Sequence, residues 1–175
     1  MINKDEFESL LLEVKRELLK FKIPVSNDID PCINYVTTFS TLGMCERNSN
    51  PLYKYNLTFS ELIFYFPINT IKDIIAHELI HSCPNCFDHR NTFKMYANTV
   101  NRLGGYNVYR CLSREDTLPY LPKHIQEKYK QEPKYFVKCN KCGDVVYRFK
   151  KSNLIQHPEQ YRCCICGGKF ESYHK

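Results

Sequence analysis

The stretch AHELIHSCPNCFDHRNTF, residues 76–93, holds three histidines, two cysteines, one glutamate and one aspartate. Its first part, His77 to His81, is an H-E-x-x-H sequence. On a helix, residues four positions apart lie one above the other, so both imidazoles can reach one metal ion. Glu78 is offset by one position, where its carboxylate can contact a water molecule at the ion without binding the ion itself. The stretch therefore predicts a catalytic zinc site with Glu78 as the general base.

A catalytic zinc ion needs a third protein ligand and keeps one position open for water. The candidates are Asp88, His89, Cys83 and Cys86. A helix is predicted from about residue 90 to 103, with a buried stripe of Phe93, Tyr96, Val100 and Leu103. His89 lies in line with that stripe, four residues before Phe93, whereas Asp88 is rotated away from it. We therefore predict His77, His81 and His89 as the zinc ligands, with Asp88 orienting a ligand or capping the helix.

The pair Cys83 and Cys86 has the C-x-x-C spacing of metal and redox sites, but no second pair lies nearby to complete four thiolates. We favour the interpretation that both residues pack and shape the loop between the histidines. A redox pair is the alternative. Cys32, Cys45 and Cys111 are likewise interpreted as buried thiols.

An α+β domain is predicted around this site. Apolar residues at helical spacing predict an amphipathic helix through residues 7–21, closed by Pro24. Residues 35–42 and 53–59 are rich in β-branched and aromatic residues and predict neighbouring antiparallel strands, joined by a loop over 43–51.

The helix that carries H-E-x-x-H is expected to begin at a signal formed by Thr70 and Asp73. An extended substrate is expected to lie along the strand edge near residues 55–59, held by backbone hydrogen bonds. No residue for stabilising an oxyanion stands out, although Tyr106 and Tyr109 are candidates.

A second metal site is predicted from two C-x-x-C pairs separated by twenty residues. Four thiolates close the coordination shell, so this zinc is expected to be structural and to stabilise a small module with little core of its own. Its ligands are Cys139, Cys142, Cys163 and Cys166. The domain boundaries that follow are 1–116 for a metalloprotease domain, 117–134 for a linker and 135–175 for a four-cysteine zinc ribbon.

Charge is spread unevenly along the chain. Residues 1–122 hold 13 Lys and Arg against 14 Asp and Glu, whereas residues 123–175 hold 12 against 5. A basic, aromatic-rich tail suits single-stranded nucleic acid, since cations follow phosphates and rings stack on bases. The predicted contacts, on DNA with single-stranded character, are Lys138, Lys141, Tyr147, Arg148, Phe149, Lys150, Lys151, Arg162 and Lys169.

The ten cysteines are expected to be metal thiolates and buried thiols of a reducing compartment rather than disulfides. No apolar run approaches the roughly 18 residues that span a bilayer, and the first residues lack the pattern of a signal peptide. A cytoplasmic protein without membrane partners is therefore expected, associated with the nucleoid or nucleus if it binds DNA.

Taken together, the H-E-x-x-H sequence, the third histidine in an H-x-x-x-F context from His89 to Phe93, and the following zinc ribbon resemble the SprT-like zinc metalloproteases. That family includes the Spartan-type proteases, which degrade proteins crosslinked to DNA. The segment TLGMCERNSN, residues 41–50, also resembles the one before their active-site helix. The resemblance covers residues 5–170 and implies a minimal zincin-like α+β domain, with zinc held by His77, His81 and His89 and with Glu78 as the catalytic glutamate. It also implies DNA-stimulated proteolysis with little sequence preference.

Two other hypotheses compete with a protease. The first is a non-enzymatic nucleic-acid-binding zinc-ribbon protein whose histidine site is structural or vestigial, which leaves Glu78 without a purpose. The second is a metal hydrolase for non-protein amides, similar to a deformylase. That motif would require an acidic residue where Ile80 stands.

Overall fold

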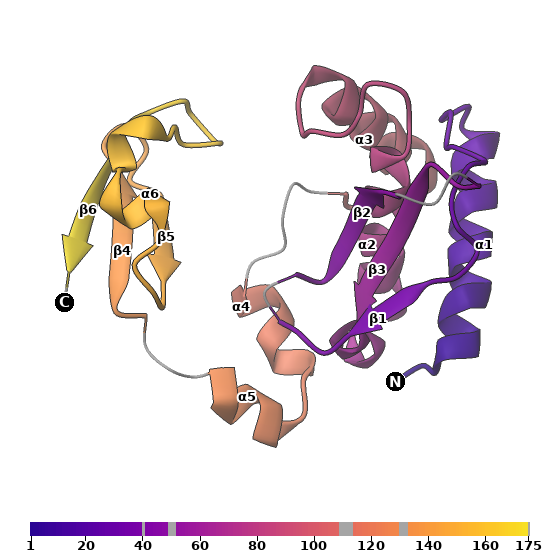
Figure 1. Ribbon diagram of the computed structural model, residues 1–175, viewed down its shortest axis with the longest axis horizontal. Helices are drawn as coiled ribbons and strands as arrows, with labels where there is room; N and C mark the ends of the chain where they lie inside the picture. The colour runs from indigo at the N-terminus through magenta and orange to yellow at the C-terminus, as the bar shows by residue number, and fades with distance from the viewer. Residues whose placement is uncertain (40, 49–51, 109–113, 130–132, 175) are drawn as a thin grey trace. The chain divides into compact units, whose positions relative to one another are not determined.

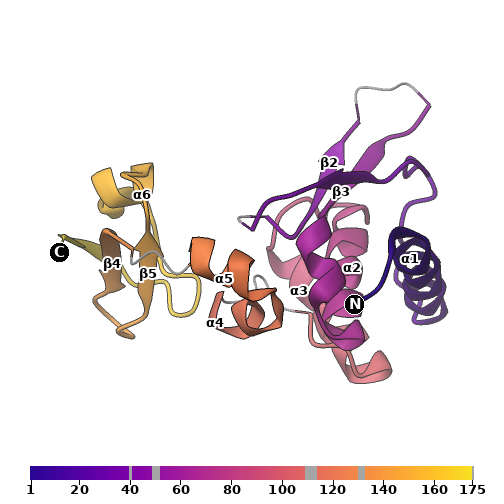
Figure 2. The same ribbon diagram turned by 90° about the horizontal axis from the view of Figure 1, so that it is seen from below.

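The structure is a computed structural model, and it describes residues 1–39, 41–48, 52–108, 114–129 and 133–174. The chain divides into two compact units, Met1–Lys123 and His124–Lys175, called here the first and the second unit. Each combines helices with a small sheet, so the predicted α+β class is confirmed (Figures 1 and 2). The predicted linker 117–134 contains two short helical segments, η2 (Leu118–Tyr120) and α5 (Lys123–Tyr129); α4 (Arg114–Thr117) precedes them.

The first predicted helix is present as α1, Lys4–Lys20. Asn3 starts it with a capping box, in which Asn3 and Glu6 exchange side-chain-to-backbone hydrogen bonds of 2.8 and 2.9 Å. Its buried stripe faces the sheet, where the Phe7 ring lies 4.9 Å from that of Phe59. Both rings are fully buried, and each such burial stabilises the fold by about 2–3 kcal/mol.

The sheet of the first unit has the order β1-β3-β2, with β1 at Asn34–Val36, β2 at Gly43–Arg47 and β3 at Tyr55–Ser60. Two predictions are wrong here. The strand over 35–42 shrinks to β1, which runs parallel to β3, and the expected loop 43–51 contains β2, the antiparallel partner of β3. The polar residues of β2 look loop-like because β2 is an edge strand, with a side open to solvent.

The helix α2, Ile68–His81, follows the short helix η1, Glu61–Tyr65. The predicted start signal at Thr70 and Asp73 is wrong: Pro67 is the N-cap and no side chain caps the helix. Pro67 has no backbone N–H. The Asp73 carboxylate does not cap α2 but accepts a hydrogen bond of 2.8 Å from the backbone N–H of Asn107. The helix is therefore held by its packing, through a face that includes Ile71, Ile75 and Leu79, all fully buried.

The predicted helix after the histidines is α3, Asn91–Gly104, and Gly105 closes it with φ of 68°, a left-handed conformation that suits glycine. Both α1 and α3 contact α2, which lies beneath the sheet in Figures 1 and 2. The metal-ligand motif thus sits on the most enclosed helix of the unit. The largest fully buried side chains around it are Phe7, Phe59, Leu18, Ile23, Leu57, Ile63, Ile71, Ile75, Leu79, Ile80, Val14 and Val100.

The second unit is built on an antiparallel sheet of order β5-β4-β6, with β4 at Tyr135–Cys139, β5 at Val145–Arg148 and β6 at Phe170–His174. Two short segments, α6 (Asn153–Gln156) and η3 (Pro158–Gln160), join β5 to the second cysteine pair. Among the described residues of this unit, the core cluster has five buried members: Val137, Cys139, Ile155, Cys163 and Phe170. Two of the five are predicted metal ligands.

Candidate metal centres

Three histidines of the first unit converge on one point. The Nε2 atom of His81 lies 3.1 Å from that of His77 and 3.2 Å from that of His89, and the last two are 2.9 Å apart. Three nitrogens bound to one tetrahedral zinc ion would be separated by roughly 3.3 Å, so the observed spacing fits such an ion. The three residues form a group that can hold a metal ion, as the sequence predicted.

The outer nitrogen of His81 is held by the backbone. Its Nδ1 lies 2.7 Å from the carbonyl oxygen of Cys86, so Nδ1–H donates to that oxygen and Nε2 keeps its lone pair for the shared centre. Burial lowers the pKa of His81, although the bond to Cys86 and the charge of Asp88 act in the opposite direction. A lowered pKa keeps the imidazole neutral, which is the form that binds metals.

The ring of Phe93 forms an apolar floor beneath the histidines. Its centroid lies 4.8 Å from His77, 4.7 Å from His81 and 4.8 Å from His89, and its side chain is buried. The sequence placed Phe93 in the buried stripe of α3 but did not identify it as the common support of the three ligands. That contact restricts the rotamers of the imidazoles and excludes water from one side.

Glu78 is buried beside the histidines and is held by the edge strand. Burial raises the pKa of its carboxyl group to about 8, although the hydrogen bond from the backbone N–H of Cys45 acts against this rise. Gly43 lies so close that a Cβ there would stand 2.7 Å from Glu78 Cγ and 2.8 Å from Glu78 Oε1. Sequence reasoning missed both strand residues because it placed them in a loop, where a glycine carries no signal of a close approach.

The two cysteines between His81 and His89 are buried and help to shape the loop that joins these ligands. Cys83 and Cys86 are 1% and 0% exposed, and burial raises the pKa of Cys83 to about 12. The backbone N–H of Cys86 donates to the carbonyl of Cys83 across 3.2 Å, which closes a turn with Asn85 at φ of 57°. The favoured prediction, that both thiols pack and shape this loop, agrees with these contacts.

Several secondary predictions for the first unit are wrong. Asp88 does not cap α3, whose N-cap is Arg90 without a side-chain cap, and it pairs with Arg90 at 3.0 Å instead. Cys32 is exposed rather than buried, whereas Cys45 is partly buried. The hydroxyl of Tyr106 donates to the carboxylate of Glu17 on α1, where it cannot serve as an oxyanion donor at the site. Cys111 and Tyr109 lie outside the described residues.

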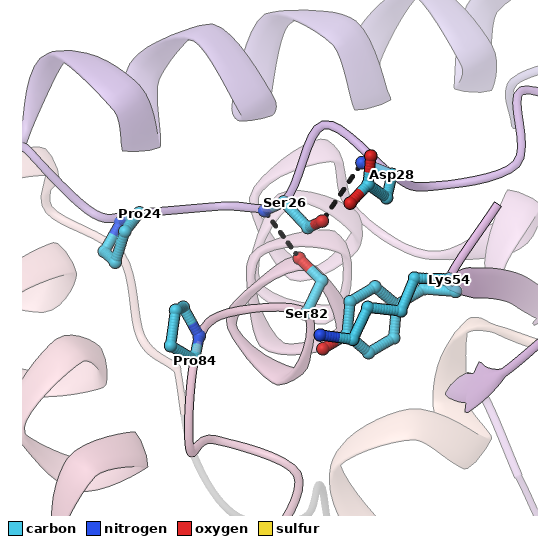
Figure 3. Close-up of a pocket in the computed structure, with 7 residues that line it drawn as sticks. Pro24, Ser26, Asp28, Lys54, Ser82 and Pro84 are labelled. Atoms are coloured by element: carbon cyan, nitrogen blue, oxygen red, sulfur yellow. Dashed lines mark hydrogen bonds between the residues drawn. The ribbon is translucent and has the colours of Figure 1, made fainter.

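A small pocket of about 250 Å³ is lined by the segment after α1, the start of β3 and the residues that follow His81 (Figure 3). The hydroxyl of Ser82, the residue after His81, accepts a hydrogen bond of 3.2 Å from the backbone N–H of Ser26 there. The Lys54 ammonium lies 5.5 Å from the centroid of the Tyr55 ring. The complete lining is Pro24, Ser26, Asp28, Lys54, Tyr55, Ser82 and Pro84.

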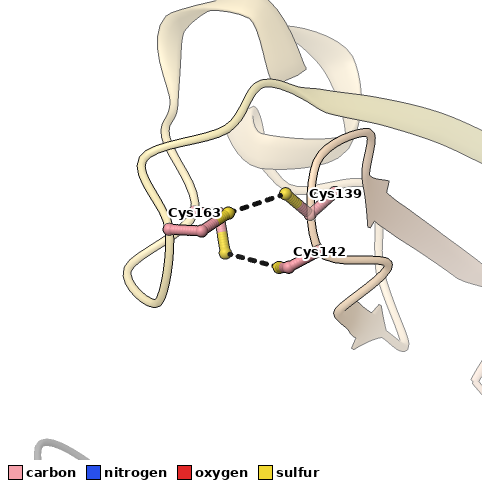
Figure 4. Close-up of side chains that lie close together, drawn as sticks. Cys139, Cys142 and Cys163 are labelled. Atoms are coloured by element: carbon pink, nitrogen blue, oxygen red, sulfur yellow. Dashed lines mark hydrogen bonds between the residues drawn. The ribbon is translucent and has the colours of Figure 1, made fainter.

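The second centre is a cluster of four cysteines: Cys139, Cys142, Cys163 and Cys166. The sulfur of Cys139 lies 3.5 Å from that of Cys166, and the sulfur of Cys142 lies 3.6 Å from that of Cys163. Sulfurs on a tetrahedral zinc ion are separated by roughly 3.8 Å, so the cluster fits such an ion. In Figure 4 the labelled side chains point toward one another from two separate loops. Cys164 is exposed and lies outside the cluster.

Both cysteine loops are tight turns, and the first one aims backbone donors at the Cys139 sulfur. Gly143 and Gly167 have φ of 77° and 71°, and their N–H groups donate to the carbonyls of Cys139 and Cys163. Hydrogen bonds from the backbone N–H groups of Cys142 and Lys141 lower the pKa of Cys139 to about 6. A Cβ on Gly168 would lie 2.7 Å from the Cys139 sulfur. The loops are therefore shaped for a thiolate at Cys139, the form that binds zinc.

The predicted nucleic-acid contacts of the second unit do not form one cluster. Lys138 and Tyr147 lie on the outer face of the sheet, whereas Arg148 lies opposite Tyr135 on the other face. Lys150 and Lys151 follow β5, and Phe149 is 42% exposed. Lys141 belongs to the first cysteine loop, and Arg162 and Lys169 bridge the second.

Sequence reasoning missed an aromatic row across the outer face. Phe136 on β4 is the direct partner of Tyr147 on β5 and of Tyr173 on β6. The Phe136 ring stacks on Tyr173 with centroids 5.3 Å apart and planes 10° apart, and lies 6.0 Å from Tyr147. Tyr147 and Tyr173 are 53% and 41% exposed. Strand pairing places these rings in one row, which the sequence alone does not show.

Comparison of the chain with family models, with curated proteins and with solved structures finds no match. The resemblance to SprT-like proteases therefore rests on the sequence motifs alone. Within the described residues, no helix has both the length and the apolar character needed to cross a membrane.

Proposed function

We propose that the first unit is a zinc-dependent endopeptidase of the SprT-like, zincin-like type, and that it acts on DNA-associated or DNA-crosslinked proteins. The observation that carries the proposal is the convergence of His77, His81 and His89 beside the buried carboxylate of Glu78. Three neutral imidazoles leave one position of a tetrahedral ion open, as catalytic zinc sites do.

Glu78 is the group that moves protons in this proposal. A zinc ion held by the three histidines would supply Lewis acidity, which lowers the pKa of water and polarises the carbonyl of the substrate. The Glu78 carboxylate takes a proton from the attacking water and delivers it to the nitrogen of the leaving amine. The Cys45 N–H and the close approach of Gly43 hold the carboxylate in place for both transfers.

The substrate is expected to pair with β2. Sequence reasoning placed it along residues 55–59, but β3 is the central strand and is paired on both sides. The strands β1 and β2 are the two edges of the described sheet, and β2 is the one whose residues Gly43 and Cys45 contact Glu78. An extended peptide added to this edge would bring its backbone past the carboxylate.

The burial of Glu78 argues against the non-enzymatic hypothesis. Placing a carboxyl group in an apolar site costs free energy, and here the cost appears as a pKa raised to about 8. A metal site that only holds the chain together has no use for such a group.

For the second unit we propose single-stranded DNA as the partner. The support is the aromatic row Tyr147–Phe136–Tyr173, with Lys138 on the same face. Exposed rings stack on unpaired bases irrespective of sequence, while lysine and arginine contact the phosphates. The excess of basic residues in this part of the chain also favours binding to the phosphates of DNA.

Hydrolysis is tested with zinc-loaded wild-type protein and Glu78→Gln, using an unfolded protein substrate with and without single-stranded DNA. We expect Glu78→Gln to lower the cleavage rate by about 10²–10⁴-fold while zinc content is unchanged, because only the proton transfer is lost. Glu127→Gln is the matched control, since Glu127 is exposed on α5 and belongs to neither metal centre nor β2. Equal cleavage by wild type and Glu78→Gln, or none by either, rejects the proposed activity.

Nucleic-acid binding is tested by fluorescence anisotropy with single-stranded DNA at fixed salt. Replacing Tyr147 with Ala is expected to weaken binding about tenfold, since stacking contributes roughly 1–3 kcal/mol per base. Tyr161→Ala removes another exposed tyrosine of the same unit and is expected to bind as wild type does. Equal weakening in both variants, or in neither, rejects the aromatic row as the contact.

A further inference from the structure

An arginine on the edge strand β2 contacts the loop that joins two of the metal ligands. The guanidinium carbon of Arg47, the last residue of β2, lies 5.3 Å from the centroid of the Phe87 ring. Phe87 belongs to the loop between His81 and His89, and its side chain is 48% exposed. This pair therefore bridges β2 and the loop that joins two metal ligands, beside the path of any peptide on β2.

The pleat of β2 places Arg47 on the side of the catalytic carboxylate. Gly43, Cys45 and Arg47 alternate with Met44 and Glu46, and their register partners on β3 are the buried Phe59, Leu57 and Tyr55. Cys45 donates to Glu78 through its backbone, and Arg47 is two residues farther, about 7 Å along the strand. In a substrate peptide paired with β2, the residue beside Arg47 is therefore two positions away from the residue beside Cys45.

The charge of Arg47 is available to such a residue. Among the described residues no carboxylate forms an ion pair with Arg47. Asp88 on the same loop is paired with Arg90, and Glu46 lies on the opposite face of the strand. The neighbouring pocket contains both Lys54 and Asp28, so it adds no clear preference for one sign of charge. The Phe87 ring also restricts the guanidinium, which lowers the entropy lost on binding.

We propose that Arg47, positioned by Phe87, is a specificity-determining residue that favours substrates with an Asp or Glu two residues from the position beside Cys45. This inference rests on the proposed endopeptidase function and narrows it to a substrate class. The preference is modest, because an exposed ion pair contributes only about 0.2–1 kcal/mol. It is therefore compatible with a protease that otherwise reads little sequence.

The first test profiles cleavage sites in a mixture of unfolded proteins by mass spectrometry. Wild type is expected to enrich Asp and Glu about threefold at one position on one side of the cut, and Arg47→Gln is expected to abolish that enrichment. Arg47→Lys keeps the charge and is expected to restore part of it. Arg102→Gln, at an exposed arginine in the last turn of α3, removes the same charge elsewhere and is expected to retain the full enrichment. Enrichment that persists in Arg47→Gln overturns the proposal.

The second test separates this inference from the proposed function, because it needs no hydrolysis. Zinc-loaded Glu78→Gln protein is titrated with two fluorescent peptides that differ only by Glu or Gln at the position in question. The Glu peptide is expected to bind about threefold more tightly, and the double variant Glu78→Gln, Arg47→Gln is expected to bind both equally. Equal binding of the two peptides to the single variant, or binding of neither, overturns the role of Arg47. Cleavage by wild type without such a difference would leave the protease proposal standing and reject only the specificity.

Discussion

The two metal centres differ in what holds their ligands in place. His77 and His81 sit on α2, a helix packed through Ile71, Ile75 and Leu79 into the core of the first unit. That core is formed mainly by apolar side chains other than the ligands, although His81 is also buried. In the second unit, Cys139 and Cys163 are themselves two of the five buried residues of the described core. The first centre is thus placed by a fold, whereas the second helps to make one.

The centres also differ in how much of the ion they would enclose. Four thiolates complete a tetrahedral shell, and backbone N–H groups that lower the pKa of Cys139 favour permanent metal binding. Three imidazoles leave one position, and Glu78, the residue after His77, is buried and restrained by β2. The same metal would therefore have separate tasks in one chain, and the difference can be tested by removing one ligand at a time.

The largest expected effect is the loss of structure in Cys163→Ser. Structural zinc contributes about 10–16 kcal/mol in small zinc modules, far more than a core of five residues can replace. We expect this variant to bind one zinc ion instead of two and to lose dispersed amide signals of residues 135–174 in NMR spectra. His77→Asn is its counterpart: it is expected to bind one zinc ion and to lose hydrolysis, while both units keep their dispersed signals. Unfolding of the first unit in His77→Asn would contradict the comparison.

A smaller effect is expected from Gly43→Ala. The new methyl carbon would stand 2.7 Å from Glu78 Cγ, so the carboxylate must move away from its position. We expect the cleavage rate to fall by at least about tenfold with zinc content unchanged, since a displacement of this size at a catalytic group is costly. Met44→Ala alters the neighbouring residue, which points to the other face of β2, and is expected to retain activity. Full activity of Gly43→Ala would show that β2 does not position Glu78.

The smallest effect concerns the metal-free protein and pH. Glu78 has a pKa of about 8 in the fold against an ordinary value of 4.5, so below pH 4.5 it is protonated in both the folded and the unfolded state. Between pH 4.5 and 8 only the unfolded state releases the proton, and the free energy of unfolding of the first unit is therefore expected to fall by up to a few kcal/mol. Urea unfolding followed by helical circular dichroism should show this decline in wild type and not in Glu78→Gln. Bound zinc is expected to weaken the dependence, since a nearby cation favours the ionised carboxylate.

Sequence spacing was sufficient for the parts of both centres that depend on local geometry. His77 and His81 share a helix face by periodicity, His89 precedes the α3 stripe in phase, and two C-x-x-C pairs imply two turns. The structure brings all seven residues into the two predicted groups. Each of these inferences needs only the repeat of a helix or of a tight turn.

The parts that sequence reasoning missed depend on pairing between distant segments. The residues Glu46 and Arg47 look like a loop because β2 is exposed at the sheet edge, and only its pairing with β3 makes it a strand. The spacing of Asp73 to Thr70 predicts a helix start signal. The actual partner of Asp73, the backbone N–H of Asn107, lies far along the chain and cannot be identified from local sequence. The aromatic row of the second unit is likewise assembled from three strands. The secondary-structure propensities of neighbouring residues cannot predict any of these long-range contacts.

The most direct test of the central claim is amide hydrogen exchange of the whole chain before and after removal of zinc by a chelator, with cleavage assayed in parallel. The account predicts that removal abolishes cleavage and the protection of residues 135–174, while α1, α2 and α3 keep most of their protection. Return of zinc should restore both. Loss of protection in α1 to α3 as well, or persistent protection of residues 135–174 without zinc, would contradict the claim that one ion is placed by a fold and the other makes one.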